Sequence, residues 1–159
     1  MKIAKEEKGI TLITLVVAIA LMVIIAGILL YNSRNYSQIS RLDNLNNDIQ
    51  ILKERVQIFY STHGSLPVVE GKKYTVAIPD EQKNPNDGTE YYLLNLDVLE
   101  DVRLNYGKDF EVAKNASDIQ DYTDLYIING QSQTIYYVKG VSVDNVMYYT
   151  DNTQYVEVD

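Results

Sequence analysis

The feature that most constrains this chain is an uncharged apolar run near its start. Residues 10–30 form the segment ITLITLVVAIALMVIIAGILL, which contains no proline and has two threonines as its only polar side chains. As an α-helix this segment would be about 32 Å long, enough to cross the hydrocarbon core of a bilayer. The run therefore predicts one membrane-spanning helix, with most of the chain outside the bilayer.

A removable secretory signal peptide is the alternative interpretation of this run. The apolar region of such a peptide usually has about 7 to 15 residues and ends at a small-residue cleavage site. The run here is longer, and Tyr31-Asn32-Ser33-Arg34 follows it in place of that site.

Basic residues favour the cytoplasmic side of a membrane, and Lys2, Lys5 and Lys8 precede the span. We expect a single-pass protein of the cytoplasmic membrane, with its C-terminal domain outside the cytoplasm.

The composition narrows the classes of function. The chain has 14 basic and 22 acidic residues, a formal charge of -8, so its surface should repel nucleic acids. It has no cysteine, which excludes disulfides, thiolate catalysis and zinc sites built on cysteine. His63 is the single histidine, and we expect it at a helix end, where its proton would favour the carbonyl dipoles. No catalytic residues, no cofactor and no enzymatic activity are predicted.

The start of the apolar run resembles a known processing signal. The segment from Lys8 to Val16, KGITLITLV, is similar to the class III signal of type IV prepilins and type II secretion pseudopilins, and the likeness covers about the first thirty residues. In that family a membrane peptidase cuts after the glycine and N-methylates the new first residue. The resemblance implies that residues 1–9 are a cleaved cytoplasmic leader, that cleavage falls between Gly9 and Ile10, and that Ile10 is methylated.

The same resemblance implies partners and a route of assembly. The partners would be a prepilin peptidase, other pilin or pseudopilin subunits, an inner-membrane platform protein and an assembly ATPase that acts indirectly. The chain would lie in the lipid bilayer before assembly and in an extracellular or cell-surface fibre afterwards. In the fibre, apolar helices that were in contact with lipid would contact one another.

Thr14 departs from the family pattern. Family members usually carry a glutamate as the fifth residue of the mature chain, where it is thought to neutralise the terminal amine of a neighbouring subunit. A threonine cannot offset an ammonium charge in hydrocarbon. Subunits without this acid resemble minor members at the fibre tip, where no subunit lies above them. The acid is also missing from some prepilin-like proteins of Gram-positive bacteria.

An amphipathic helix is predicted to continue from the membrane span. No proline or glycine occurs from Tyr31 to Thr62, so residues 10–62 should form one helix of roughly 80 Å that ends before Gly64 and Pro67. The helical spacing predicts one apolar stripe, and the residues between its members, Asp48 among them, are expected on the wet faces. The stripe consists of Ile39, Leu42, Leu45, Ile49, Leu52, Val56 and Phe59. We expect residues 31–62 to pack on a sheet of the same chain, and a coiled-coil dimer is the alternative.

Residues 63–159 are predicted to form a small outer domain on that helix. A turn at residues 129–132 separates two β-rich runs and favours an antiparallel hairpin. The predicted elements are strands at Lys73–Ile78, Asp124–Ile128, Gln133–Val138 and Val143–Thr150, an edge strand at Gln154–Val158, a short helix at Leu96–Val102 and a loop at Asn84–Gly88. The predicted fold class is therefore α+β and pilin-like: a long N-terminal helix packed on a small antiparallel sheet.

Two further groups of residues are candidates for a role. Asp118, Asp121 and Asp124 offer oxygen ligands for calcium, which some pseudopilins hold before their final strands, although a solvated loop is the alternative. The tyrosine pairs point to opposite faces of a strand, so one member of each should be buried and the other exposed. These pairs are Tyr91-Tyr92, Tyr136-Tyr137 and Tyr148-Tyr149.

The predicted function is structural. The chain should be a subunit of a type IV pilus-like or type II secretion-like fibre, in a minor or tip position. One alternative is a binding module for DNA, a secreted substrate or a surface, with the fibre as its carrier. Another is a single-pass membrane anchor that does not polymerise.

Overall fold

One long helix opens the fold. The computed structural model describes residues 4–75 and 78–151, and α1 (Ala4–His63) runs without a break through the two predicted helical segments. The helix ends where predicted, because Gly64 takes a left-handed φ of 70° and its N–H donates to the Tyr60 carbonyl over 2.8 Å. It begins six residues before the predicted start at Ile10, so the backbone of Gly9 and Ile10 is helical.

The chain divides into two compact units, Met1–Ile39 and Ser40–Asp159. In the described part of the first unit the only element is α1. The second unit contains the rest of α1 and every strand of the fold as described, so the amphipathic half of the helix belongs to the same unit as the sheet.

The sheet of the second unit is an antiparallel meander. Its strands β1 (Val68–Lys73), β2 (Tyr91–Leu94), β3 (Tyr126–Asn129) and β4 (Ile135–Tyr137) are neighbours in chain order. The register pairs Leu93 with Ile127, and Ile127 with Tyr136. The predicted α+β class, with a long helix on a small antiparallel sheet, is confirmed, as is the hairpin now seen as β3 and β4.

The first predicted strand is wrong in position. Strand β1 ends at Lys73, where the prediction at Lys73–Ile78 begins; Tyr74 and Ile78 are buried outside any strand, and residues 76–77 lie outside the described residues. Because β1 is an edge strand, its polar residues can stay in water. Its sequence therefore lacks the alternating hydrophobic pattern from which a strand is predicted. Its register on β2 shifts between Val68 and Lys73, where Gly71 takes a φ of 73°.

The predicted strand at Val143–Thr150 is also wrong. This segment lies in a separate hairpin, in which β5 (Val141–Val143) pairs with β6 (Val146–Tyr148). Asp144 and Asn145 form its two-residue turn with φ of 48° and 66°, a left-handed conformation that these residue types tolerate. The chain then returns to the edge of β4, where the Tyr149 carbonyl accepts from the Tyr137 N–H over 2.7 Å. The predicted strand at Gln154–Val158 lies outside the described residues.

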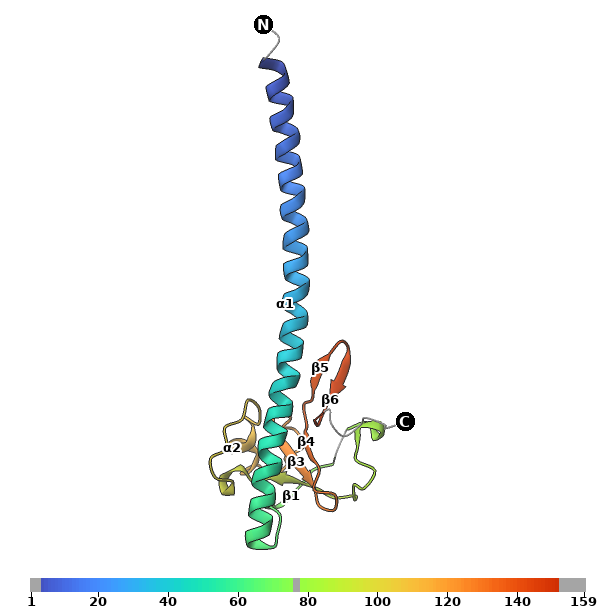
Figure 1. Cartoon of the computed structure of the whole chain (residues 1–159). Coiled ribbons are helices and arrows are strands. Elements are labelled where there is room, and N and C mark those ends of the chain that lie inside the picture. The colour runs from blue at the N-terminus through green and yellow to red at the C-terminus, as the bar shows by residue number, and fades with distance from the viewer. Residues whose placement is uncertain (1–3, 76–77, 152–159) are drawn as a thin grey trace. The chain divides into compact units, whose positions relative to one another are not determined.

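The helix packs on one face of the sheet, as Figure 1 shows for the second unit. Leu45, Ile49, Leu52 and Val56 of the predicted stripe are buried, so the stripe contacts the sheet of its own chain, as predicted. Ile39, at the start of the predicted stripe, is instead 54% exposed. The core on this face also contains Leu94, Leu99, Tyr126, Ile128, Ile135, Tyr137 and Val141.

A second core covers the opposite face of the sheet. Here α2 (Phe110–Ala113), a four-residue helix that was not predicted, lies with the neighbouring loops. The predicted helix at Leu96–Val102 is wrong in length, since only the 3-10 turn η2 (Leu96–Val98) forms; a second 3-10 turn, η1, spans Asp80–Gln82. The second core contains Tyr74, Ile78, Tyr91, Leu93, Phe110, Ala113, Ile119, Leu125, Ile127 and Tyr136.

The two cores decide the burial of the tyrosine pairs. Tyr136 and Tyr137 point to opposite faces of β4, yet both are buried, because each face has its own core. The prediction that one of them is exposed is therefore wrong. Tyr91 is buried and Tyr92 half-buried, whereas Tyr148 and Tyr149 are both half-buried, so neither pair has the predicted exposed member.

Candidate functional site

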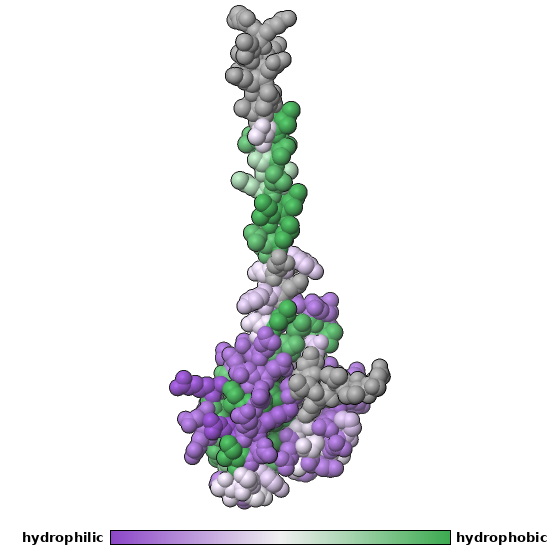
Figure 2. Space-filling model, in the orientation of Figure 1, coloured by the Kyte–Doolittle hydropathy of each residue, from purple (hydrophilic) through white to green (hydrophobic). Residues whose placement is uncertain are grey.

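The apolar run of α1 is exposed along its whole described length. All side chains from Leu12 to Tyr31 are exposed, and the large apolar ones among them are between 51% and 70% exposed. They form the continuous hydrophobic band along α1 in Figure 2. Burial of such a surface contributes about 25 cal/mol per Å², so the band favours an apolar environment. In the described part of the chain, α1 is the one helix long and apolar enough to cross a membrane.

The predicted processing residues lie on this helix. Gly9 and Ile10 belong to its second turn, and Thr14 is exposed one turn after Ile10. Glycine in a helix interior is less favourable than alanine by about 1 kcal/mol, so the helix opens more easily at Gly9 than at its apolar neighbours. A peptidase needs an extended backbone, which this position can supply. Cleavage at this junction and the role of Thr14 remain predictions.

A buried carboxylate in the second unit is the polar site that the sequence did not reveal. Asp48, predicted on a wet face of α1, is 0% exposed, so that prediction is wrong. Asp48 lies three residues after Leu45 and one before Ile49, which places it beside the buried stripe. The sequence predicted that this side chain is exposed, because an acidic residue on an amphipathic helix usually faces water.

Donors from two other segments surround the Asp48 carboxylate. The Asn105 N–H lies 3.0 and 2.9 Å from its two oxygens, and the Asn105 side-chain amide donates over 2.9 Å. The Tyr106 N–H donates over 3.0 Å and the Tyr126 hydroxyl over 2.8 Å. These bonds compensate the loss of water around a buried charge and connect α1 to the 105–106 loop and to β3. Burial first, and then the nearby Asp48 charge, raise the pKa of Tyr126 far above its usual value, so its hydroxyl remains a donor.

A second carboxylate, Asp124, holds the loop that precedes β3. It accepts from the Gly107 N–H over 2.7 Å and from the Tyr137 hydroxyl over 3.1 Å. Its own N–H donates to Asp109 over 2.9 Å. Burial, followed by the Asp124 charge, raises the pKa of Tyr137 well above the ordinary value for tyrosine.

The three aspartates predicted as calcium ligands have different surroundings in the structure. Asp118 and Asp121 are exposed, and Asp118 accepts from the Gln120 N–H within its own turn. Asp124 is directed instead at Gly107 and Tyr137. Within residues 4–75 and 78–151, no group of three or more His, Cys, Asp or Glu residues is placed to hold a metal ion. The structure therefore does not bring the three aspartates together as a calcium site.

A third aspartate, Asp87, anchors the predicted loop at Asn84–Gly88 to the sheet. It accepts from the hydroxyls of Tyr91 over 3.0 Å and Tyr136 over 2.6 Å, and also from Ser132. Burial and then the hydrogen bond to Asp87 raise the pKa of Tyr91 to about 12. Tyrosine–aspartate pairs thus fasten loops to both faces of the sheet in a domain without disulfides.

The raised pKa values of these tyrosines predict that the protein unfolds at high pH. An unfolded tyrosine has a pKa of about 10, whereas the pKa values of Tyr91, Tyr126 and Tyr137 in the folded protein are higher. The folded state therefore binds more protons above pH 10, so its stability is complete below about pH 10 and falls as the pH rises beyond that value. Phenolate absorbance and far-ultraviolet circular dichroism, followed together, should show a late titration step that coincides with unfolding. Titration of all tyrosines near pH 10 with an unchanged dichroism spectrum would contradict this.

Comparisons of the chain with protein-family models, with curated proteins and with solved structures found no match. The fold and the site define an α+β protein with one N-terminal helix able to cross a membrane.

Proposed function

We propose that this protein is a structural subunit of a type IV pilus-like or type II secretion-like fibre, made as a single-pass membrane precursor. The observation that carries the proposal is the difference between the two halves of α1. From Leu45 to Val56 the apolar residues of the helix are covered by the sheet, whereas from Leu12 to Leu30 no described part of the chain covers them. The first half therefore needs lipid or other copies of the same kind of helix.

The proposed mechanism follows from that need. In the bilayer the apolar half of α1 is surrounded by lipid, and all its backbone groups are bonded within the helix. In a fibre, neighbouring helices would replace the lipid around the same side chains. The Lys8-Gly9-Ile10 junction, which resembles the class III signal, supports processing between Gly9 and Ile10 before this exchange. No catalytic step by the protein itself is involved.

The test of the proposal is the chemical identity of the mature N-terminus. Mass spectrometry of the protein from a cell that contains a prepilin peptidase should find Ile10 as the first residue, with a methyl group on its nitrogen. A chain that retains residues 1–9 under these conditions would overturn the proposal. The remaining possibility would then be a single-pass anchor that does not polymerise.

We propose a minor or tip position because Thr14 stands where the family usually has glutamate. A threonine side chain cannot neutralise the terminal amine of a subunit packed above it. Antibody labelling of fibres should find this subunit at their ends. Labelling along the whole length of the fibres would show that the tip position is wrong, while the assignment to a fibre would stand.

A further inference from the structure

A cavity of the second unit, which we call the cationic cavity, lies beside the Asp124 network. Its volume is about 480 Å³. Its lining comes from the first turn of α1 in this unit, from the loop at residues 105–108, from Asp124 and from the chain between the end of β4 and the start of β5. The lining residues include Arg41, Asn105, Tyr106, Lys108, Tyr137 and Lys139.

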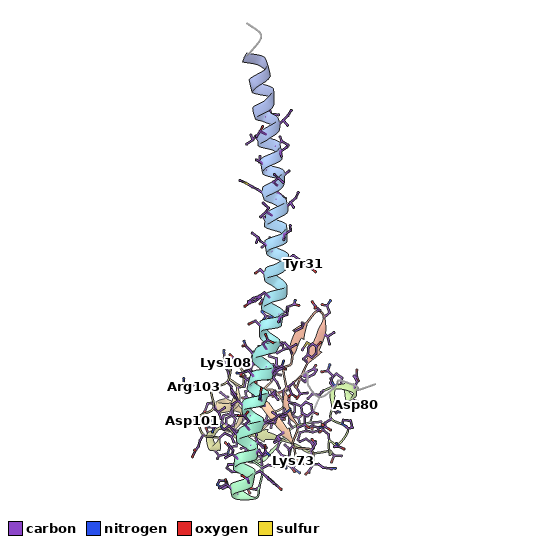
Figure 3. The ribbon with its side chains drawn as sticks, viewed as in Figure 1. Tyr31, Lys73, Asp80, Asp101, Arg103 and Lys108 are labelled. Atoms are coloured by element: carbon purple, nitrogen blue, oxygen red, sulfur yellow. The ribbon has the colours of Figure 1, made fainter. Side chains whose placement is uncertain are left out.

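The charge of the cationic cavity is opposite to that of the unit around it. Residues 40–159 contain 10 basic and 20 acidic side chains. In the part of the unit that the structure describes, five of these basic side chains have no ion pair or side-chain hydrogen bond: Arg41, Arg55, Arg103, Lys108 and Lys139. Three of the five line this one cavity, and all three are exposed. Lys108 extends from its loop beside α1 in Figure 3.

Asp124 is the one carboxylate in the described lining, and its charge is partly compensated. The same carboxylate oxygen accepts both the Gly107 N–H and the Tyr137 hydroxyl. Three cations thus share the lining with one carboxylate that is already hydrogen-bonded. The rings of Tyr106 and Tyr137 stack at a centroid distance of 4.9 Å and form one wall of the cavity.

We propose that the cationic cavity binds the phosphate of an anionic glycerophospholipid headgroup, such as phosphatidylglycerol. Arginine and lysine are the side chains that bind phosphate oxygens through charge-assisted hydrogen bonds. The lipid source is favoured by the chain itself, because Arg41 follows Leu30, the last residue of the apolar run, by 11 residues. Even a fully extended chain of that length spans no more than about 40 Å, so a bilayer that holds the run keeps Arg41 within that distance of its hydrocarbon core. This inference rests on the membrane-inserted precursor of the proposed function, but not on processing or assembly.

The test uses the full chain in micelles of a neutral detergent. Native mass spectrometry should show that it retains added phosphatidylglycerol in preference to phosphatidylcholine. The double variant K108Q/K139Q should weaken the retention of phosphatidylglycerol at least tenfold. The matched control R55Q/R103Q removes the same charge from two unpaired arginines outside the cavity, and it should retain the lipid as the unchanged chain does. The variant K108R/K139R, which keeps the charge, should also retain it.

Three outcomes would overturn this inference. Equal loss in K108Q/K139Q and R55Q/R103Q would mean that overall charge, not the cavity, attracts the lipid. Equal retention of the two lipids by the unchanged chain would exclude a headgroup site. Binding of soluble glycerol 1-phosphate as tight as that of phosphatidylglycerol would assign the cavity to a free phosphate ester. None of these outcomes affects the mature N-terminus, so a failure here leaves the test of the proposed function intact.

Discussion

Replacement of Asp48 by alanine is expected to lower the free energy of unfolding by about 3 to 5 kcal/mol, because buried donors lose their shared acceptor. The N–H groups of Asn105 and Tyr106 and the hydroxyl of Tyr126 all donate to this carboxylate. Without it, the 105–106 loop and β3 are no longer bonded to α1 at this point. Urea unfolding of the full chain in a neutral detergent, followed by circular dichroism, measures the change.

Asp43 provides a matched control for this prediction. It lies on the same helix and is exposed, so Asp43→Ala makes the same chemical change in water and should alter the free energy of unfolding by less than about 0.5 kcal/mol. Tyr126→Phe removes one donor and leaves the carboxylate in place, so a smaller loss of about 1 to 2 kcal/mol is expected. If Asp48→Ala lowered the free energy of unfolding as little as Asp43→Ala does, the Asp48 network would not hold the helix to the sheet.

Replacement of Gly9 by leucine is expected to abolish removal of the leader. The proposed cleavage requires the helix to open at Gly9, and a leucine favours the helical backbone and adds a side chain at the bond to be cut. The variant should therefore remain in the membrane with residues 1–9 attached, and it should not enter fibres. The measurement is the mass of the intact chain, isolated from cells that contain the peptidase.

Gly27→Leu is the control for the leader experiment. Gly27 lies in the same apolar helix, and a Cβ built on it meets nothing within 4 Å in the structure. This variant carries the same substitution away from the junction, so its leader should be removed as in the unchanged chain. A mature Ile10 terminus in the Gly9→Leu variant would show that glycine is not required at the junction.

Local patterns were enough to predict much of this fold. The apolar run, the absence of helix breakers up to Thr62 and the glycine after His63 predicted α1 and its end. The turn between two β-rich runs predicted the hairpin of β3 and β4. In each case the signal lies within a few neighbouring residues, because helix periodicity, capping and turn chemistry are local properties of a chain.

Two of the errors come from contacts between distant residues, whereas the third is a local turn that was overlooked. Strand β1 was misplaced because an edge strand with polar residues has a weak pattern of its own and forms through its pairing with β2. Val143–Thr150 has the composition of one strand, but Asp144 and Asn145 turn it into a hairpin. Tyr136 and Tyr137 are both buried because α2 and its loops cover the face of the sheet opposite α1.

By itself the sequence determined the long helix, its apolar half and the residues that resemble a processing signal, since all of these follow from residue types along a single segment. Only the tertiary structure decided that Asp48 is buried and that Arg41, Lys108 and Lys139 line one cavity. The sequence separation between Asp48 and its hydrogen-bond partner Tyr126 is 78 residues, and no local sequence pattern indicates a contact between residues so far apart. Packing of α1 on the sheet brings these groups together, so their roles depend on the folded domain.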